Sequence, residues 1–599
     1  MSDDDSNNVH TLAPVIKPER PSYACHAERA RCNGRVLAPG LYFHTLRDNK
    51  PADVRICSPL EVLAVTSDNH GDNYGLLVRF LPSRAKVWRQ WSVPMELLAG
   101  DGAELRAALL RMGVTISPRH RGALMDYLIE SSPEREVLAA TRVGWHGRGL
   151  FVMPRQVIGE SDVVFQSLDL GGHDFDAHGS MDAWQSEVAG RCIGNPVLLL
   201  AVSAALAGPL LTLLDVDGGG FHLFGDSSSG KTIAMAVAAS VWGLPRDFLR
   251  TWNATSTGLE GVATMRNDTF LPLDEIGEAR AQDVGNIIYA LANGTGRQRG
   301  QVTGLPRAVH RWRLMALSTG EMTIGKHMAS GGVHSKAGQE LRMLDVPVYR
   351  RFGAFDDLHG LAADHDAADA DARRGAGRAF ADALKHASGK HHGHAGPAFV
   401  AQLVALSAVD PDAAAADLDA RFADMRKAFP VSTGQEARAA ARFAAAALAG
   451  ELAIEFGILP WPPGTASAGL VEMYGAWIGH RGKGQSEELK ILRAVLAFID
   501  RHAWRFSDIG DTDATPAPDR AGWWRQAGDG RQYLFTPDAL AEAAPSYDLR
   551  RISACLNAAG VIAVDCGGRN LATKVSVPGG DRPRLYPVSY AALQRATGD

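Results

Sequence analysis

The sequence predicts an α/β fold with a phosphate-binding loop after one of its strands, and three stretches support this. The first is the octapeptide 225–232, which fits the pattern G-x-x-x-x-G-K-[ST]. The second is the mostly apolar run 269–273, which is followed by an Asp-Glu pair at 274–275. The third is the apolar run 314–317, which is followed by Ser-Thr at 318–319. Polar residues that follow short apolar runs are typical of a site at the carboxyl edge of a parallel sheet.

The octapeptide is the candidate nucleotide site. An apolar run, 221–224, predicts a strand before it, and another, 233–239, predicts a buried helix after it. The glycines let backbone N–H groups point at phosphates, and the helix N-terminus adds its positive dipole end. We expect Lys231 to reach the β- and γ-phosphates and Thr232 to bind Mg²⁺, so ATP and Mg²⁺ are the expected cofactors. The remaining cradle residues are Gly225, Asp226, Ser227, Ser228, Ser229 and Gly230.

The Asp-Glu pair has the form of a Walker B motif. Asp274 is expected to hold the Mg²⁺ shell, and Glu275 to orient or deprotonate the attacking water. Pro272 inside this strand is unusual because it removes one donor from the ladder. In the third stretch, either Ser318 or Thr319 is expected to position the water or to sense the γ-phosphate, which is the sensor-1 role.

Several arginines are candidates for contact with the nucleotide. Arg342 is the candidate arginine finger, and Arg350 and Arg351 compete for that role, with a surface ion pair as the alternative for each. A finger supplied in trans requires a neighbouring subunit, so we expect a ring-shaped oligomer. Arg438 and Arg442 lie four apart on one face of a predicted lid helix, and Arg438 is the candidate sensor-2 residue that returns to the γ-phosphate.

A glycine-rich basic segment, 293–300, separates the Walker B stretch from the next strand. Arg297 and Arg299 within it would contact the phosphates of DNA without reading its sequence, and a solvated turn is the alternative. The net charge of -5 gives no global signal of nucleic-acid binding, so any such binding must use a local basic patch.

The length of 599 residues implies several domains. We expect a disordered tail (1–20), an α+β domain (21–180), a P-loop ATPase core (181–360), a helical lid (361–480) and a winged-helix-like domain (481–599). Six cysteines make no disulfide framework, which fits the cytoplasm. The apolar run 197–214 is expected to be a buried pair of helices and not a membrane span.

Two further clusters have weak metal-binding patterns. Cys25 and Cys32 lie on either side of His26 but lack a second pair of ligands, so a zinc site is not favoured. The histidines between 386 and 394 lack carboxylate or cysteine partners at suitable spacing, and we expect a solvent-exposed loop there.

The motifs at 225–232, 273–277, 291–294 and 317–321 together resemble the domain-of-unknown-function ATPases borne by phages, plasmids and chromosome cassettes. That family is often described as superfamily II helicase derivatives or DNA primase/helicases, and the resemblance extends from about residue 51 to about 463. It implies an AAA+-type ATPase, similar to MCM-like hexameric replicative helicases, with a C-terminal winged helix. Relatives fused to a primase carry a zinc finger and a toprim-type region. This chain has no matching cysteine set or acidic cluster, so a primase or replication initiator would be a separate partner.

Two functions remain. The first is an ATP-dependent DNA helicase or translocase, replicative and borne by a mobile element, that acts as a ring on single- or double-stranded DNA. The alternative is an AAA+-type switch or assembly factor that hydrolyses ATP without moving along nucleic acid. A small-molecule kinase fits less well, because the chain has an Asp-Glu pair and a sensor-like Ser-Thr. No membrane partner is expected.

Overall fold

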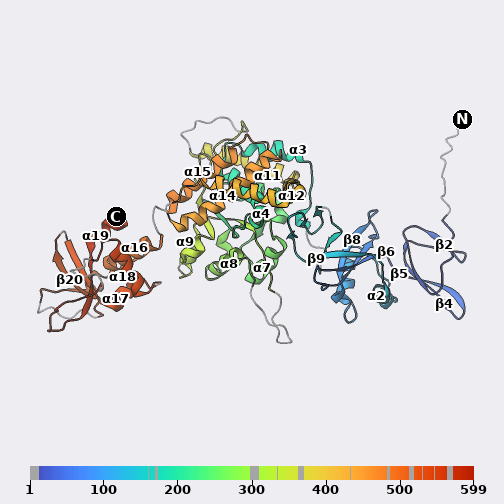
Figure 1. Ribbon diagram of the computed structural model, residues 1–599, viewed down its shortest axis with the longest axis horizontal. Helices are drawn as coiled ribbons and strands as arrows, with labels where there is room; N and C mark the ends of the chain where they lie inside the picture. Colours follow the sequence, from blue (N-terminus) through green and yellow to red (C-terminus); the bar gives the residue numbers. More distant parts are fainter. Residues whose placement is uncertain are drawn as a thin grey trace.

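The computed structural model describes residues 13–598 except 160, 169–172, 297–308, 334, 362–369, 432, 482–485, 512–518, 529, 546 and 563–570. Three bodies follow one another along the long axis of the molecule, with the N-terminal body at one end and the C-terminal body at the other (Figure 1). The predicted tail lies mostly outside the described residues, and so do Arg297 and Arg299.

The N-terminal body is built from small sheets. One is antiparallel, in the order β1-β4-β5, and a five-stranded mixed sheet has the order β13-β9-β6-β7-β8. Two helices, α1 (Ala103–Arg111) and α2 (Arg121–Glu130), cover its core. The strands are β1 (Ser22–His26), β4 (Gly40–Arg47), β5 (Lys50–Cys57), β6 (Leu60–Ser67), β7 (Gly75–Phe80), β8 (Arg89–Pro94), β9 (Glu136–Ala140) and β13 (Val163–Phe165).

The central body contains a parallel five-stranded sheet in the order β15-β16-β17-β14-β18. Its strands are β14 (Gly219–Phe224), β15 (Arg250–Thr251), β16 (Phe270–Asp274), β17 (Met315–Gly320) and β18 (Met343–Pro347). Since β17 lies between β14 and β16, the ends of the three predicted motif strands meet at one edge. Pro272 lies where β16 has a partner on one side only, because β15 pairs with Leu273 and Asp274 alone.

Helices cover both faces of this sheet, as expected for a parallel sheet whose three central strands, β14, β16 and β17, are buried along nearly all of their length. Against one face pack α4 (Pro196–Leu213), α5 (Lys231–Ser240), α14 (Gly434–Glu455) and α15 (Thr465–Arg481). Against the other pack α7 (Ser256–Met265), α8 (Ala281–Asn293) and α9 (Ile324–Ser330). Within the described part of the chain, α4 is the one helix long and apolar enough to cross a membrane, and 89% of it is buried. The run is therefore buried as predicted, but it forms one helix that contains Pro209 and not a pair.

Further helices extend the α14 layer: α11 (Ala370–Lys390), α12 (Ala395–Val409) and α13 (Pro411–Arg426). Asp410 caps α13, since its side chain accepts from the N–H groups of Asp412 and Ala413. The expectation of a solvent-exposed histidine loop is wrong for two of its residues, and His386, which is exposed, lies within α11. His391 and His392 are buried, and the backbone of His392 pairs with that of His178 at 3.0 and 3.1 Å. A segment far away in sequence therefore covers the histidines.

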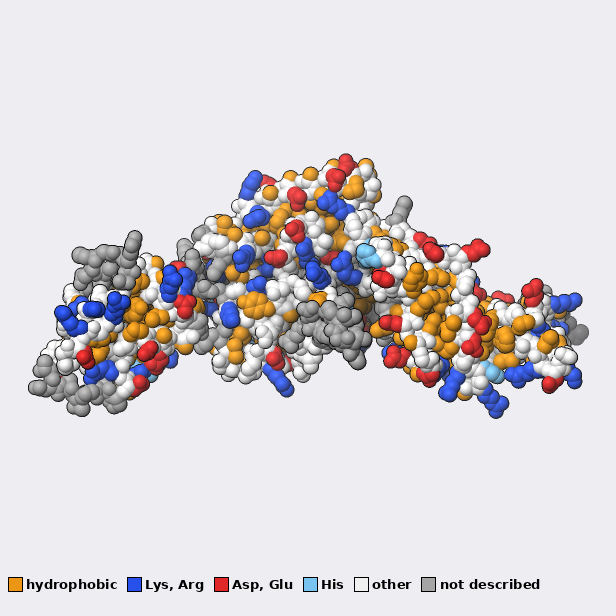
Figure 2. Space-filling view, turned by 60° about the horizontal axis from the view of Figure 1, so that its bottom comes forward, with side chains coloured by type: hydrophobic (Ala, Val, Ile, Leu, Met, Phe, Trp, Pro, Cys, Tyr) orange, Lys and Arg blue, Asp and Glu red, His pale blue; other side chains and the backbone are white. Residues whose placement is uncertain are grey.

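The C-terminal body joins four helices to a five-stranded sheet in the order β19-β20-β21-β23-β22. Its elements are α16 (Ser486–His502), β19 (Phe506–Asp508), β20 (Gly522–Ala527), β21 (Gly530–Phe535), α17 (Pro537–Ala543), α18 (Leu549–Ala558), β22 (Thr573–Lys574), β23 (Arg584–Ser589) and α19 (Tyr590–Thr597). Lys and Arg side chains gather on this body (left in Figure 2). Two of its arginines lie over tryptophan rings, Arg531 at 4.4 Å from Trp524 and Arg520 at 5.0 Å from Trp523.

Candidate functional site

The candidate phosphate loop, residues 225–232, joins β14 to α5 and is packed from outside by the segment that follows β18. Gly230 has φ 98°, and a Cβ there would lie 2.7 Å from the ring of Phe355. The Ala354 N–H donates to the Ser229 carbonyl at 2.6 Å. Because C=O and N–H of a trans peptide point in opposite directions, this bond turns the Gly230 N–H away from Ala354. The loop is thus shaped by its own packing, and only glycine fits at residue 230.

Lys231 is held inside the loop. Its ammonium group donates to the carbonyls of Gly225 (2.9 Å) and Asp226 (2.6 Å) and to the Ser229 hydroxyl (3.2 Å). Burial lowers the pKa of Lys231, while the nearby carboxylates, Glu275 first, act to raise it. The lysine is 7% exposed, so its charge acts in a partly desolvated site, where it attracts anions more strongly than it would in water.

Three oxygen-bearing side chains converge beside the loop, one from α5 and one from the end of each of two strands. The Thr232 hydroxyl donates to Asp274 Oδ1 at 3.3 Å, and the Thr319 hydroxyl donates to the same oxygen. Hydroxyl and carboxylate oxygens are the ligands that Mg²⁺ prefers, usually one or two from the protein with phosphate and water completing the shell. Thr232 and Asp274 therefore fit the metal that the sequence predicts.

Glu275 has a strained backbone at this point. Its φ is 52°, in the left-handed region that residues other than glycine seldom adopt, and its N–H donates to Thr319 Oγ1 at 3.1 Å. The carboxylate accepts from the Gly277 N–H at 3.0 Å. Strain of this kind costs about 1–3 kcal/mol and is concentrated at functional sites. The turn after β16 thus fixes both acidic residues relative to Thr319.

The two sensor-1 candidates, Ser318 and Thr319, lie on opposite faces of β17. Neighbouring residues of a strand point to opposite faces, and Ser318 is fully buried on the face away from Asp274. There Trp252 Nε1 donates to its hydroxyl at 2.9 Å. Burial lowers the pKa of His222 to about 4, and its Nε2 lies 2.9 Å from the Met322 carbonyl, so Nδ1 accepts from Ser318 at 2.8 Å. Ser318 is therefore a core residue, and the expectation of a role for it at the nucleotide is corrected.

Arg342 lies at the opposite edge of the sheet, directly before β18. Its guanidinium donates to Asn293 Oδ1 and to the Gly338 carbonyl. A five-residue strand spans about 16 Å, which exceeds the reach of an arginine, so Arg342 cannot contact the phosphate loop of its own chain. Arg350 forms ion pairs with Asp356 and Glu472, and the Arg351 guanidinium lies 5.0 Å from the ring of Phe352.

The lid helix does not bring an arginine to the phosphate loop. Arg442, on α14, is buried and donates to the carbonyls of Leu341 (2.8 Å) and Gly218 (3.1 Å), both at the amino edge of the sheet. Arg438 lies one turn earlier on this helix and is exposed. The expectation that Arg438 acts as sensor 2 within its own chain is therefore wrong, because α14 crosses the sheet at the edge away from the loop.

The predicted DNA-contacting arginines, Arg297 and Arg299, lie outside the described residues. The residues on either side of the gap run antiparallel. The Gly296 N–H donates to the His310 carbonyl and the Trp312 N–H to the Gly294 carbonyl, both at 2.9 Å. The chain therefore enters the basic segment after α8 and leaves it before β17 at one place, the root formed by residues 294–296 and 310–312.

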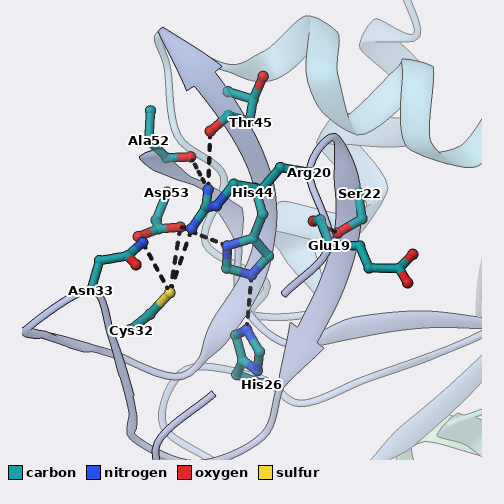
Figure 3. A network of polar contacts seen from close by, with 10 residues as sticks. All are labelled: Glu19, Arg20, Ser22, His26, Cys32, Asn33, His44, Thr45, Ala52 and Asp53. Atoms are coloured by element: carbon teal, nitrogen blue, oxygen red, sulfur yellow. Dashed lines mark hydrogen bonds and ion pairs between the residues drawn. The ribbon is translucent and has the colours of Figure 1, made fainter. Parts of the chain in front are cut away.

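A polar cluster in the N-terminal body was not expected from the sequence (Figure 3). Donor atoms of Cys32, His44 and Asp53 lie within 4.8 Å of one another. The Arg20 guanidinium enters the same cluster, pairs with Asp53, and donates to the carbonyls of Thr45 (3.0 Å) and Ala52 (2.9 Å). Because Arg20 already neutralises Asp53, a metal cation beside it would be repelled, and the cluster serves to hold the chain before β1 against β4 and β5. No sequence pattern could show this, since the four residues come from separate segments.

The comparisons with known proteins agree with this architecture. The family described as "Domain of unknown function (DUF927)" matches residues 35–311. A search of curated proteins finds no match. A solved structure described as "SCCmec type IV Cch - active helicase" matches with TM-score 0.66 and 18% identity, over 96% of this chain and 99% of that one. A solved structure of NtrX from Brucella abortus matches with TM-score 0.17 and 16% identity over 24% of this chain and 35% of that one, which is too low for a shared fold. The chain is therefore similar to the DUF927 family over residues 35–311 and shares its fold, nearly end to end, with the helicase structure.

Proposed function

We propose that this protein is an ATP-dependent DNA helicase or translocase that acts as a ring, with each ATP bound between two subunits. One observation carries the proposal. Thr232, Asp274 and Thr319 converge beside the phosphate loop in a chain whose fold matches that of an active helicase over 96% of its length. The proposal includes an AAA+-type core, a helical lid, a winged-helix-like C-terminal domain and a cytoplasmic, replicative role on a mobile element.

Each residue of the site has a role that its contacts support. The loop amides and Lys231 bind the phosphates, and Thr232 and Asp274 hold Mg²⁺, which when bound neutralises charge that develops on the phosphate oxygens. Glu275 orients the attacking water and accepts its proton. Thr319 fixes the position of Glu275 by accepting from its backbone N–H. Hydrolysis thus depends on groups from three neighbouring strand ends.

The neighbouring subunit supplies the remaining positive charge. Lys231 is the one cation that the described structure places in the loop, whereas Arg350 and Arg442 are engaged elsewhere. Arg342 cannot reach the loop of its own chain, but it can serve a second copy. Arg297 and Arg299 would then contact DNA phosphates inside the ring, in agreement with a basic segment that starts and ends at one root.

The alternative is a switch or assembly ATPase that moves no nucleic acid. ATP hydrolysis measured with and without single-stranded DNA distinguishes the two, with Lys231→Ala as the inactive reference. A translocase is expected to be stimulated several-fold by DNA, and reversal of charge at Arg297 and Arg299 should abolish that stimulation while leaving the basal rate. Robust hydrolysis that ignores both DNA and RNA would contradict the proposal and favour the switch.

A further inference from the structure

Arg342 is held in one orientation by three contacts. Its Nε and Nη2 groups donate to Asn293 Oδ1 at 3.1 and 2.9 Å, and Nη1 donates to the Gly338 carbonyl at 2.8 Å. The guanidinium carbon lies 4.6 Å from the ring centre of Tyr289, one turn before Asn293 on α8. The amide oxygen of Asn293 thus accepts from the Nε/Nη2 edge of the guanidinium, and the ring of Tyr289 packs against its face.

These contacts leave part of the guanidinium available. The group carries five N–H bonds, and the contacts above use one on each nitrogen. Within the described structure, one N–H on each of the two Nη atoms is therefore left over. Each of these two N–H groups can donate to a phosphate oxygen. Arg342 is thus preorganised for an anion that its own chain cannot supply, because its own phosphate loop lies at the other edge of the sheet.

Asn293 has a second connection. It is the last residue of α8, and Gly294 follows with φ 65°, the left-handed conformation that ends a helix. The Gly294 carbonyl then accepts from Trp312, and Thr295 pairs with Arg311. Asn293, which binds Arg342, therefore lies directly before the root of the basic segment. A cavity of about 440 Å³ adjoins this root and is lined by Asn293, Thr295 and Arg311, so the root has room to shift.

We infer that Asn293 is a positioning residue that presents Arg342 to the nucleotide of a second copy of this chain and links that presentation to the root of the basic segment. A displacement of the root, such as DNA bound to the segment would cause, moves Asn293 and with it the guanidinium. Hydrolysis in one subunit then responds to DNA held by its neighbour. The inference rests on the proposed function, because it requires Arg342 to act in trans.

The test compares Asn293→Ala, Asn293→Asp and the control Gln282→Ala in the full-length oligomer. Asn293 is exposed, so alanine should be tolerated in the fold, which the thermal unfolding midpoint checks. Gln282 is on the same helix, and its amide donates to the Gly331 carbonyl, away from Arg342. For Asn293→Ala we expect kcat to fall about tenfold with KM within twofold of wild type, because Arg342 acts on the transition state. Stimulation by single-stranded DNA should be lost.

Asn293→Asp keeps an oxygen that accepts from both Nε and Nη2, so it should recover at least half of the basal kcat, and Gln282→Ala should behave as wild type. Normal kcat and normal DNA stimulation in Asn293→Ala would overturn the inference. The variant Arg342→Ala distinguishes failure of the inference about Asn293 from failure of the proposed trans arginine. If it is inactive while Asn293→Ala is normal, the inference alone fails. If Arg342→Ala hydrolyses ATP normally, the trans arginine fails and the inference fails with it.

Discussion

At the scale of single residues, the Thr319 hydroxyl connects the two acidic groups of the candidate site. It donates to Asp274 and accepts from the backbone N–H of Glu275. One oxygen atom thereby fixes both the carboxylate proposed to hold the metal and the turn that carries the proposed base. Its neighbour, Ser318, makes contacts of similar number in the opposite direction, to His222 and Trp252 in the core.

This division predicts opposite effects for two similar substitutions. Thr319→Val keeps the shape of the side chain and removes the hydroxyl, so kcat should fall roughly a hundredfold while the protein remains folded. Ser318→Ala removes buried hydrogen bonds, so it should cost about 1–3 kcal/mol of stability and leave kcat within about threefold. Steady-state ATPase assays and urea unfolding of both variants measure these effects. A catalytic defect in Ser318→Ala without loss of stability would contradict the assignment.

The same pair shows what sequence can and cannot provide. A local pattern predicts Lys231, Thr232, Asp274 and Glu275, because the spacing of the motifs and the chemistry of phosphate are both visible in one dimension. The choice between Ser318 and Thr319 depends on which face of β17 turns toward β16, and the sequence leaves both possible. Long-range placement fails more completely: Arg438 looks like a lid arginine until α14 is seen to cross the amino edge of the sheet.

At the scale of elements, the edge strand β18 carries an acid into an unusual environment. Asp345 accepts from the Ile324 N–H at 3.0 Å, at the start of α9, and lines a cavity of about 510 Å³ between the central and C-terminal bodies. Burial raises its pKa from 3.8 to about 7, helped by the charge of Glu340 and opposed by Lys490. Lys490, on α16, also pairs with Glu340, so this junction joins the two bodies by charge.

The raised pKa of Asp345 has a defined consequence for stability. Between pH 4 and pH 7 the folded protein binds more protons at this group than the unfolded chain, so its contribution to stability falls as pH rises and stays low above about 7. Asp345→Asn keeps the oxygen that accepts from Ile324 and cannot ionise. This variant should therefore be more stable than wild type at pH 8. The gain is at most about 4 kcal/mol, and the place of the carboxyl at the border of the cavity keeps it below that limit. The gain should shrink toward pH 4.

Thermal unfolding of both proteins at pH 5 and pH 8 measures this difference. Asp382→Asn is a suitable control, since it makes the same chemical change on α11, outside the junction. An equal gain for Asp345→Asn at both pH values would show that ionisation of Asp345 is not the cause.

At the scale of the whole molecule, the proposed site needs groups from two chains. The phosphate loop and the oxygens of Thr232, Asp274 and Thr319 stand at the carboxyl edge of the sheet, while Arg342 is held at the amino edge by Asn293. A single subunit cannot bring these halves together, because the strands themselves separate them. Two subunits arranged head to tail can, and repetition of a head-to-tail contact closes a ring when the rotation permits.

Complementation between two inactive variants tests this arrangement. Lys231→Ala lacks a working loop but keeps Arg342, and Arg342→Ala has the reverse defect, so each alone should hydrolyse little ATP. In a random equal mixture, about a quarter of the interfaces pair an intact loop with an intact arginine from the neighbour. The mixture should therefore recover roughly a quarter of the wild-type rate once subunits have exchanged. The matched control mixes Arg342→Ala with the double variant, which offers no intact arginine and should stay inactive. If the two single variants also stay inactive together although they assemble, the nucleotide site is not shared between subunits, and the ring mechanism loses its structural basis.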